Sequence, residues 1–194
     1  MEIKKTLLTR QTTTRLFMIH SDLPRRDETW FRDLYRTHYR DIVAYARRRT
    51  NQCSADDIAA NTFMLAWQKR FEIPEDNERV WLFGVARNLA LNDKRTSRRK
   101  DALLQRLRSQ AKSDQDQNSF PESKDYGYSE QLQIALNQLP ATDKEILMLL
   151  CWEELSYNEI SEILYETPNA LRIRSYRARK LLAKKLNKIT LQGE

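Results

Sequence analysis

The last helix that the sequence predicts carries the side chains best suited to contact nucleic acid. From Pro168 to Lys185 it holds arginines and lysines along its length and no acidic residue. At helical spacing, one set of small or apolar residues can face a protein core: Leu171, Ser175, Ala178 and Leu182. A second set shares another face near the start of the helix: Arg172, Ile173, Tyr176 and Arg177. Arginine can bind a guanine edge through two hydrogen bonds, while isoleucine and tyrosine can contact a thymine methyl group or a sugar.

Basic residues farther along the same helix suit phosphate groups better than base edges. They are Arg179, Lys180, Lys184 and Lys185. A solvated basic helix, charged only for solubility, is the alternative reading of such a run.

The helix before it makes this alternative less favoured. Ser156–Leu164 and Pro168–Lys185 are separated by three residues, which is the spacing of a helix-turn-helix. "SYNE" matches a capping box, and "TP" places a capping threonine before a proline at the first helical position. Such turns often carry glycine where Tyr165 stands, so Tyr165 must either adopt left-handed backbone geometry or the turn must differ.

Catalytic metal chemistry has weak support in the sequence. Asp56 and Asp57 are adjacent, so on a helix they point about 100° apart and do not converge on one ion. His20 and His38 have no matching carboxylate pattern, and Cys53 and Cys151 have no partner at ligand spacing. Only three glycines occur in the chain, which is too few for a Gly-rich phosphate loop and disfavours a nucleotide-binding fold. We expect no metal, no cofactor and no enzymatic activity.

Composition points to an anionic partner. The chain has 194 residues, a formal net charge of +7 and a pI of about 9.5, which favours nucleic acid first and a membrane surface second. The longest apolar run, "ILMLLCW", is far shorter than the ~20 residues that span a bilayer. We therefore expect no membrane insertion. The two cysteines lie far apart in the sequence, which makes a disulfide framework unlikely and fits a reducing cytoplasm.

The periodicity predicts an all-α fold with two small helical domains. One helix starts near Trp30, a second is capped by Ser54, and a third begins near Trp81 with Gly84 at a close approach of a neighbouring helix. Residues 113–130 are polar and acidic, and we expect a flexible linker there. "TDKE", at 142–145, matches a second capping box. The expected boundaries are an N-terminal extension at 1–27, a first domain at 28–112 and a second domain at 131–194.

Taken together, these two halves resemble the extracytoplasmic-function group of the sigma-70 family of bacterial RNA polymerase. The resemblance covers about 30–186 and involves two motif regions in the family's order. It implies a sigma-2-like domain followed by a sigma-4-like helix-turn-helix domain.

In the first domain, "SADDIAANTFMLAWQKR" is similar to the family segment that docks on the clamp coiled coil of the polymerase. The matching positions are Asp56, Asp57, Ile58, Thr62, Phe63 and Trp67. Ala60 stands where glutamine is usual and Asn61 where a carboxylate is usual, which implies weaker polar docking. Core packing is the alternative role for Phe63 and Trp67.

"WLFGVARNLALNDKRTSRRK" is similar to the region that reads the −10 promoter element. The resemblance implies that the loop at 71–80 captures a flipped base and that Asn88 reads its edge, because a pocket must offset the cost of unstacking. Strand backbones would be held by Arg87, Lys94, Arg95, Arg98 and Arg99. A helix surface that is merely solvated is the alternative for these residues.

The second domain is similar to the family's −35-binding domain, and the resemblance points to the same residues as the spacing does. The implied function is that of a promoter-specificity subunit that recognises −35 and −10 elements and initiates transcription. Its implied partners are the clamp coiled coil and flap of core RNA polymerase, promoter DNA and an anti-sigma factor. The linker would pass through the polymerase near the template strand, where its acidic charge would mimic nucleic acid, or it would serve as a simple tether. A stand-alone helix-turn-helix regulator that binds operator DNA as a dimer is the alternative.

Overall fold

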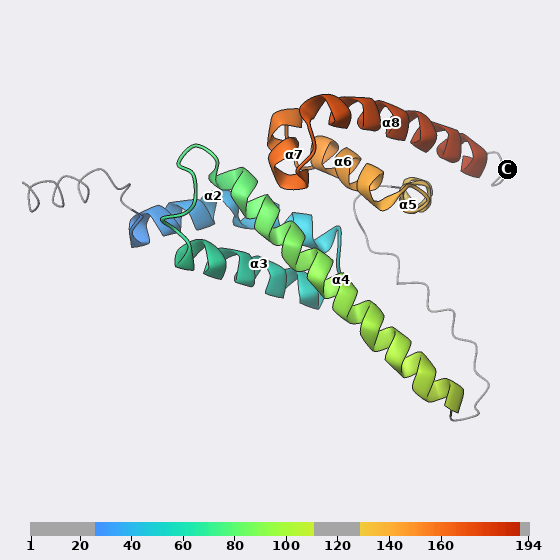
Figure 1. Cartoon of the computed structure of the whole chain (residues 1–194), viewed down its shortest axis with the longest axis horizontal. Helices are drawn as coiled ribbons and strands as arrows, with labels where there is room; N and C mark the ends of the chain where they lie inside the picture. The colour runs from blue at the N-terminus through green and yellow to red at the C-terminus, as the bar shows by residue number, and fades with distance from the viewer. Residues whose placement is uncertain (1–25, 111–128, 191–194) are drawn as a thin grey trace, which may run out of the picture.

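Every regular element in the part of the chain that the computed structural model describes, residues 26–110 and 129–190, is an α-helix (Figure 1). The helices are α2 (Glu28–Arg47), α3 (Gln52–Gln68), α4 (Glu78–Gln110), α5 (Glu130–Asn137), α6 (Ala141–Cys151), α7 (Tyr157–Leu164) and α8 (Pro168–Thr190). They form two bodies, α2–α4 and α5–α8, which confirms the predicted all-α class. Most of the expected linker, and all of the expected N-terminal extension except Arg26 and Asp27, lies outside the described residues.

The first body is a three-helix arrangement around an apolar core. Asp27 caps α2 by accepting hydrogen bonds from the backbone N–H groups of Thr29 and Trp30. The expected cap of α3 was wrong by one turn, because Asn51 occupies that position and its side chain accepts from the N–H of Ser54. Core side chains from all three helices then meet in one cluster, with Ile42, Phe63 and Leu82 among them. This packing sets the position of α4.

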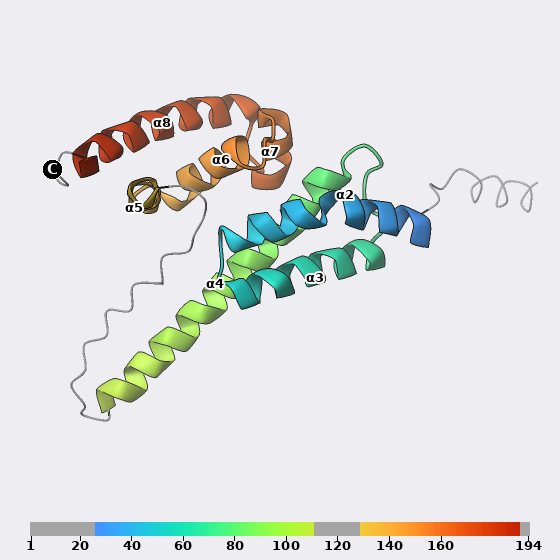
Figure 2. The same cartoon turned by 180° about the vertical axis from the view of Figure 1, so that it is seen from behind.

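Helix α4 extends well beyond the body that holds its first half (Figures 1 and 2). Its buried residues end at Ala90, and almost every described side chain after it is exposed. The expected close approach at Gly84 was wrong, since a Cβ at that position would meet nothing within 4 Å. The glycine instead borders open space on the α4 surface.

The second body is built from three short helices and the longer α8. Leu136, Leu139, Leu147 and Ala178 form one of its buried clusters, and Leu182 packs against it. The expected capping box at 142–145 was wrong, because α6 already begins at Ala141, after Pro140, and has no side-chain cap. Glu145 therefore lies inside the helix and pairs with Arg49 of the first body at 3.0 Å.

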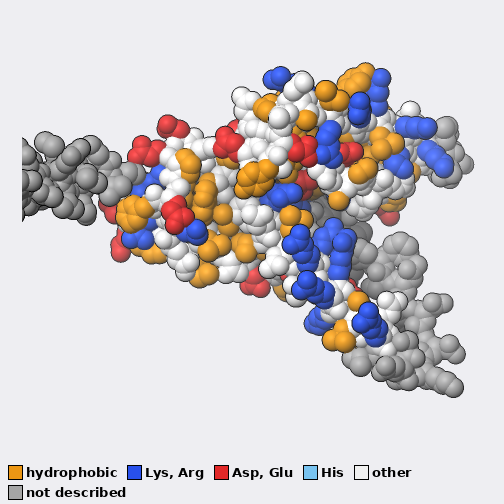
Figure 3. All heavy atoms as spheres, in the orientation of Figure 1, with side chains coloured by type: hydrophobic (Ala, Val, Ile, Leu, Met, Phe, Trp, Pro, Cys, Tyr) orange, Lys and Arg blue, Asp and Glu red, His pale blue; other side chains and the backbone are white. Residues whose placement is uncertain are grey.

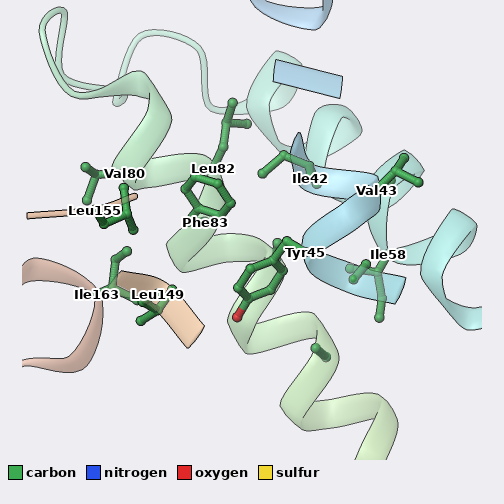
Figure 4. Packing of buried hydrophobic residues seen from close by; sticks show 14 of the residues in the cluster. Ile42, Val43, Tyr45, Ile58, Val80, Leu82, Phe83, Leu149, Leu155 and Ile163 are labelled. Atoms are coloured by element: carbon green, nitrogen blue, oxygen red, sulfur yellow. The ribbon is translucent and has the colours of Figure 1, made fainter. Parts of the chain in front are cut away.

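The two bodies pack against each other through α4 and α7. Val80 and Phe83 of the first body and Leu149, Leu155 and Ile163 of the second belong to one continuous buried cluster (Figure 4). Figures 1 and 2 show α7 beside the first half of α4, with α8 on the outer side. The described chain is therefore compact at one end, with the second half of α4 projecting from it.

Candidate nucleic-acid interface

The turn between α7 and α8 has the geometry of a helix-turn-helix. The predicted capping box of α7 is present: Ser156 accepts from the N–H of Glu159, whose carboxylate accepts from the N–H of Ser156 at 2.7 Å. Tyr165 adopts left-handed geometry with φ 56°, so the first of the two alternatives left open by the sequence describes this turn. The predicted cap of α8 is also present, with the Thr167 hydroxyl accepting from Ala170 N–H at 3.3 Å.

Helix α8 separates its core-facing and outward-facing residues as the spacing predicted. Leu171, Ser175 and Ala178 are buried. The outward set, Arg172, Ile173, Tyr176 and Arg177, is exposed, and 47% of Ile173 and 58% of Tyr176 is open to solvent. A face that mixes arginine with exposed apolar side chains is suited to base edges and thymine methyl groups. We name these four residues the recognition face.

Arg174 lies on the same helix but has a structural role. Its guanidinium pairs with Asp143 of α6 at 2.9 Å and with Glu166 in the turn at 2.5 Å. These contacts fix the turn and α8 relative to α6. Farther along, Arg179 is exposed and donates to the Tyr157 hydroxyl at 3.0 Å, while the exposed Lys180 lies 4.6 Å from the centroid of the Tyr176 ring. Both remain at the protein surface, where phosphates can reach them.

A second basic surface lies on the projecting half of α4. Lys94, Arg95, Arg98 and Arg99 are all exposed there, and Figure 3 shows blue side chains gathered along this half of the helix. Arg87 differs, because it is half-buried and its Nε atom is buried without a hydrogen-bond partner among the described residues. The four exposed residues suit the backbone of a nucleic-acid strand.

Asn88 is exposed and lines a pocket of about 240 Å³ beside the first turns of α4. Trp81 and Gly84 from α4, and Pro74 and Asn77 from the preceding loop, also line it. The open space at Gly84 leaves room beside the tryptophan ring for a flat group. Apolar walls with an amide at the rim are the chemistry that a captured base needs.

The loop before α4 is held by a residue that the sequence reading left unassigned. Arg26 is only 3% exposed, pairs with Glu78 at 3.1 Å and donates to the carbonyl oxygen of Ile73 at 3.1 Å. Its guanidinium also lies 4.4 Å from the centroid of the Trp30 ring. The sequence places two basic residues just before the start of α2, but the sequence alone does not show that the Arg26 side chain is buried.

The predicted docking residues on α3 divide into two groups. Asp56 and Asp57 are exposed and Trp67 is half-buried, whereas Ile58, Thr62 and Phe63 are buried. The Thr62 hydroxyl donates to the carbonyl oxygen of Ile58 at 2.7 Å. Phe63 therefore takes the alternative role of core packing, whereas Trp67 is only partly covered. Ile58 and Thr62 are buried beside Phe63, and a buried helix face is not available to a partner.

Aromatic rings form a connected cluster between α2 and α3. Phe31 lies 5.3 Å from Trp67, and Tyr35 lies 4.9 Å from Phe63 and 4.6 Å from Tyr39 between ring centroids. The edge of the cluster is open, with Tyr35 39% exposed. Nearby on the chain, Met64 and Phe71 are also exposed. Such an apolar edge is a candidate protein-contact surface.

The part of the chain that the structure describes holds no group of side chains suited to bind a metal ion. No three histidine, cysteine or carboxylate side chains gather there. Asp56 instead pairs with Arg47 at 3.6 Å on the surface. No helix within those residues is long and apolar enough to cross a membrane.

Comparison with known proteins gives the family. Residues 34–100 match Sigma-70 region 2, and residues 129–182 match Sigma-70, region 4. The RNA polymerase sigma factor YlaC of Bacillus subtilis (strain 168) is 30% identical over 162 residues, covering 80% of this chain and 91% of that protein. The chain belongs to the sigma-70 family, in its extracytoplasmic-function group.

A second relative is the RNA polymerase sigma factor CarQ of Myxococcus xanthus, 26% identical over 84% of this chain and 92% of that protein. Two solved structures share the fold. The sigma factor RpoE of Bartonella quintana, solved with the anti-sigma factor NepR, has a TM-score of 0.59 and 24% identity over 81% of this chain and 96% of that chain. CnrH, solved with the cytosolic domain of CnrY, has a TM-score of 0.59 and 22% identity over 84% of this chain and 90% of that chain.

This chain is accordingly an RNA polymerase sigma factor that acts in transcription initiation with core polymerase and promoter DNA. Both matched regions are present in the family's order, which disfavours the alternative of a stand-alone dimeric regulator. Sigma factors regulate transcription and are not themselves enzymes.

Proposed function

We propose that this sigma factor reads the −35 element with the recognition face of α8 and the −10 element with the pocket at Asn88. The exposure of Arg172, Ile173, Tyr176 and Arg177 on a capped helix-turn-helix is the observation that carries the proposal. Arg179 and Lys180 then lie where they can hold phosphates on either side of the bases. Arg174 contributes by fixing the turn.

At the −10 element, the loop before α4 and the pocket provide the site for an unstacked base. Trp81 supplies an apolar wall and Asn88 an amide that can both donate and accept. The projecting half of α4, with Lys94, Arg95, Arg98 and Arg99, holds the strand backbones. Because these contacts are electrostatic, promoter binding weakens as salt concentration rises. We assign Arg87 to a supporting role, since its guanidinium is partly buried.

Core polymerase docks on the outer face of α3 and on the neighbouring aromatic edge. The exposed carboxylates of Asp56 and Asp57 supply polar contacts, while Trp67 and Met64 supply apolar area. Ile58, Thr62 and Phe63 support this face from inside. The residue ranges 28–112 and 131–194 serve as the sigma-2-like and sigma-4-like domains, joined by 113–130.

Further features follow from family membership. Both solved sigma factors described above were solved with a protein partner, which supports control of this chain by an anti-sigma factor. We place the protein in the bacterial cytoplasm and assign it no catalytic activity and no cofactor.

Run-off transcription tests the function. Purified bacterial core polymerase is incubated with and without this protein on a pool of promoter fragments from the source genome. We expect transcripts from a small set of promoters only when the protein is present. No transcripts, together with tight binding of the protein alone to a palindromic duplex, would show a conventional regulator instead.

A further inference from the structure

We propose that Tyr157, the first residue of α7, positions two arginines of α8 for −35 recognition: its ring orients Arg172 toward a base edge and its hydroxyl group orients Arg179 toward a phosphate. This inference rests on the proposed function of α8 and deepens it. It gives a role to Tyr157 and to Ser175, the fully buried serine of α8, which have none in the function proposed above.

A hydrogen-bond network joins α7 to α8 directly beneath the exposed arginines. The Tyr157 hydroxyl lies 2.9 Å from Ser175 Oγ and 3.0 Å from Arg179 Nη2. Ser175 Oγ donates to the carbonyl oxygen of Arg172 at 2.9 Å. Arg179 also donates to Ser175, from Nη2 to Oγ at 3.3 Å and from Nε to the carbonyl oxygen at 3.4 Å. One tyrosine and one serine thus connect both arginines.

Counting protons fixes the direction of each hydrogen bond. A serine hydroxyl has one proton to donate and two lone pairs that accept. Because the Arg172 carbonyl oxygen can only accept, Ser175 Oγ gives its proton to that oxygen. The Tyr157 hydroxyl therefore donates to Ser175 Oγ, and its own oxygen accepts from Arg179. Ser175 Oγ is then fully satisfied in its buried position, as a stable polar contact requires.

This network holds one edge of the Arg179 guanidinium and leaves the other edge open. Nε and Nη2 donate to Tyr157 and Ser175, whereas Nη1 has no hydrogen-bond partner in the part of the chain that the structure describes. Arg179 is exposed, so Nη1 is accessible to an anion. A guanidinium that is already fixed loses less conformational freedom when it binds a phosphate. Arg179 should therefore contribute more to −35 binding than the neighbouring Lys180, a flexible point charge.

The ring of Tyr157 acts on the arginine that reads a base. Its centroid lies 5.5 Å from the guanidinium carbon of Arg172, within the ~6 Å range of cation–π attraction. Arg172 is exposed, and a free arginine side chain samples many rotamers. The ring limits this sampling, which lowers the entropy that Arg172 loses when it forms two hydrogen bonds to a guanine.

Spacing along α8 explains why one tyrosine reaches both arginines. Arg172 and Arg179 are seven residues apart, about two helical turns, so they lie on the same side of the helix. Ser175 lies between them, three residues after the first and four before the second. The capping box of α7 encloses Tyr157 and fixes its backbone where α7 contacts α8.

Two substitutions separate the role of the hydroxyl group from that of the ring. Tyr157→Phe removes only the oxygen, so Arg179 loses an acceptor while the ring stays beside Arg172. Tyr157→Leu removes both. Tyr165→Phe is the matched control, because Tyr165 is 89% exposed in the same motif and its hydroxyl has no hydrogen-bond partner among the described residues.

Binding of the full-length variants is measured by fluorescence anisotropy on a duplex that carries the −35 element of a promoter found by run-off transcription. A series of duplexes with single base-pair changes reports base preference. Tyr157→Phe should weaken binding about three- to tenfold on every duplex and leave base preference unchanged, because it affects a phosphate contact. Tyr157→Leu should in addition flatten the preference at the base pair whose preference Arg172→Ala abolishes. Tyr165→Phe should change neither quantity.

Double-mutant cycles distinguish positioning from a general structural role. Tyr157→Phe and Arg179→Ala disrupt the same contact, so together they should weaken binding at least about threefold less than the product of their separate effects. Tyr157→Phe with Arg172→Ala should give the full product. The proposal is overturned if both pairs give the full product, or if Tyr157→Leu keeps the whole base preference. The cycle with Tyr157→Phe, which keeps the ring packing, decides the proposal even if Tyr157→Leu does not fold.

Failure of this proposal is distinguishable from failure of the proposed function. If Arg172→Ala abolishes a base preference but both Tyr157 variants bind as the wild type does, the positioning role is wrong and −35 reading by α8 stands. If Arg172→Ala and Arg179→Ala both bind every duplex as the wild type does, the proposed function of α8 is itself wrong.

Discussion

Arg26 and Ile73, 47 residues apart in the chain, are joined by a buried 3.1 Å hydrogen bond from the guanidinium to the carbonyl oxygen. Because the same guanidinium pairs with Glu78 at the start of α4, it fixes the loop to the helix that follows. The pocket at Asn88 lies directly beyond this junction. Arg26 is thus a positioning residue for the −10 site and does not itself line the pocket.

Replacing Arg26 with alanine should loosen the loop and impair −10 reading. Glu78 would lose its partner and the Ile73 carbonyl its donor, which costs about 1–3 kcal/mol. We expect weaker binding to −10 single strand, with unchanged binding to a −35 duplex. Arg32→Ala, an exposed arginine on α2, is the control. Equal losses at both elements would indicate general unfolding and not a loop effect.

Two arginines on α8 should respond differently to alanine. Arg172 is exposed on the recognition face, so Arg172→Ala should cost about 1–3 kcal/mol of −35 duplex binding and leave thermal stability unchanged. Arg174 pairs with Asp143 and Glu166, so Arg174→Ala should remove about 1 kcal/mol or less from the free energy of unfolding. The Tm should fall accordingly. Fluorescence anisotropy and a thermal melt separate the two effects. A lower Tm for Arg172→Ala would contradict the assignment of Arg172 to DNA binding alone.

The left-handed backbone of Tyr165 in the turn should lower the stability of the fold. Tyr165 is 89% exposed, so its side chain contributes little packing, while its φ of 56° is unfavourable for any residue with a Cβ. Tyr165→Gly should therefore raise the free energy of unfolding by about 1 kcal/mol. Tyr165→Ala keeps the backbone penalty and serves as the comparison in urea titrations. If alanine were as stabilising as glycine, backbone strain would not be the cause.

His38 gives the chain a pH dependence near neutrality. Burial is the largest cause that lowers its pKa, and the charge of Arg79 adds to it, while Asp41 and Glu78 oppose it. The unfolded chain then takes up a proton at higher pH than the folded one, near the ordinary value of about 6.5. Its contribution to stability is present above that value and is lost as pH falls toward the folded pKa. In His38→Gln the free energy of unfolding should fall less steeply than in the wild type as pH is lowered from about 7.5 to 5.5. The same pH dependence in both proteins would show that His38 is not its cause.

The sequence predicted the second body well because its signals are local. A capping box, an N-terminal proline and a basic helix with small core-facing residues each act within a few positions of one another, and the spacing of Leu171, Ser175 and Ala178 alone defines the buried face. The capping box predicted at 142–145 is absent and shows the limit of such local signals: α6 begins at Ala141, directly after Pro140, so the matching residues lie inside the helix.

Contacts between distant segments were not predictable in this way. Nothing local distinguishes Arg26 or Arg49 from the many exposed arginines nearby, because their burial depends on carboxylates about 50 to 100 residues away. The same holds for α3, where periodicity found the apolar residues but could not show that Phe63 turns inward and Met64 outward. Helical spacing predicts which residues share one face of a helix, whereas the packing of the whole chain decides which neighbours bury that face.

Transcription from a promoter library randomised at both elements tests the central claim most directly. Core polymerase with the wild-type protein, Arg172→Ala or Asn88→Ala would transcribe the library, and the selected sequences would be read from the transcribed templates. We predict that Arg172→Ala relaxes selection only near −35 and that Asn88→Ala relaxes it only near −10. If either substitution altered selection at the opposite element, or if neither altered selection at all, the assignment of α8 and α4 would be wrong.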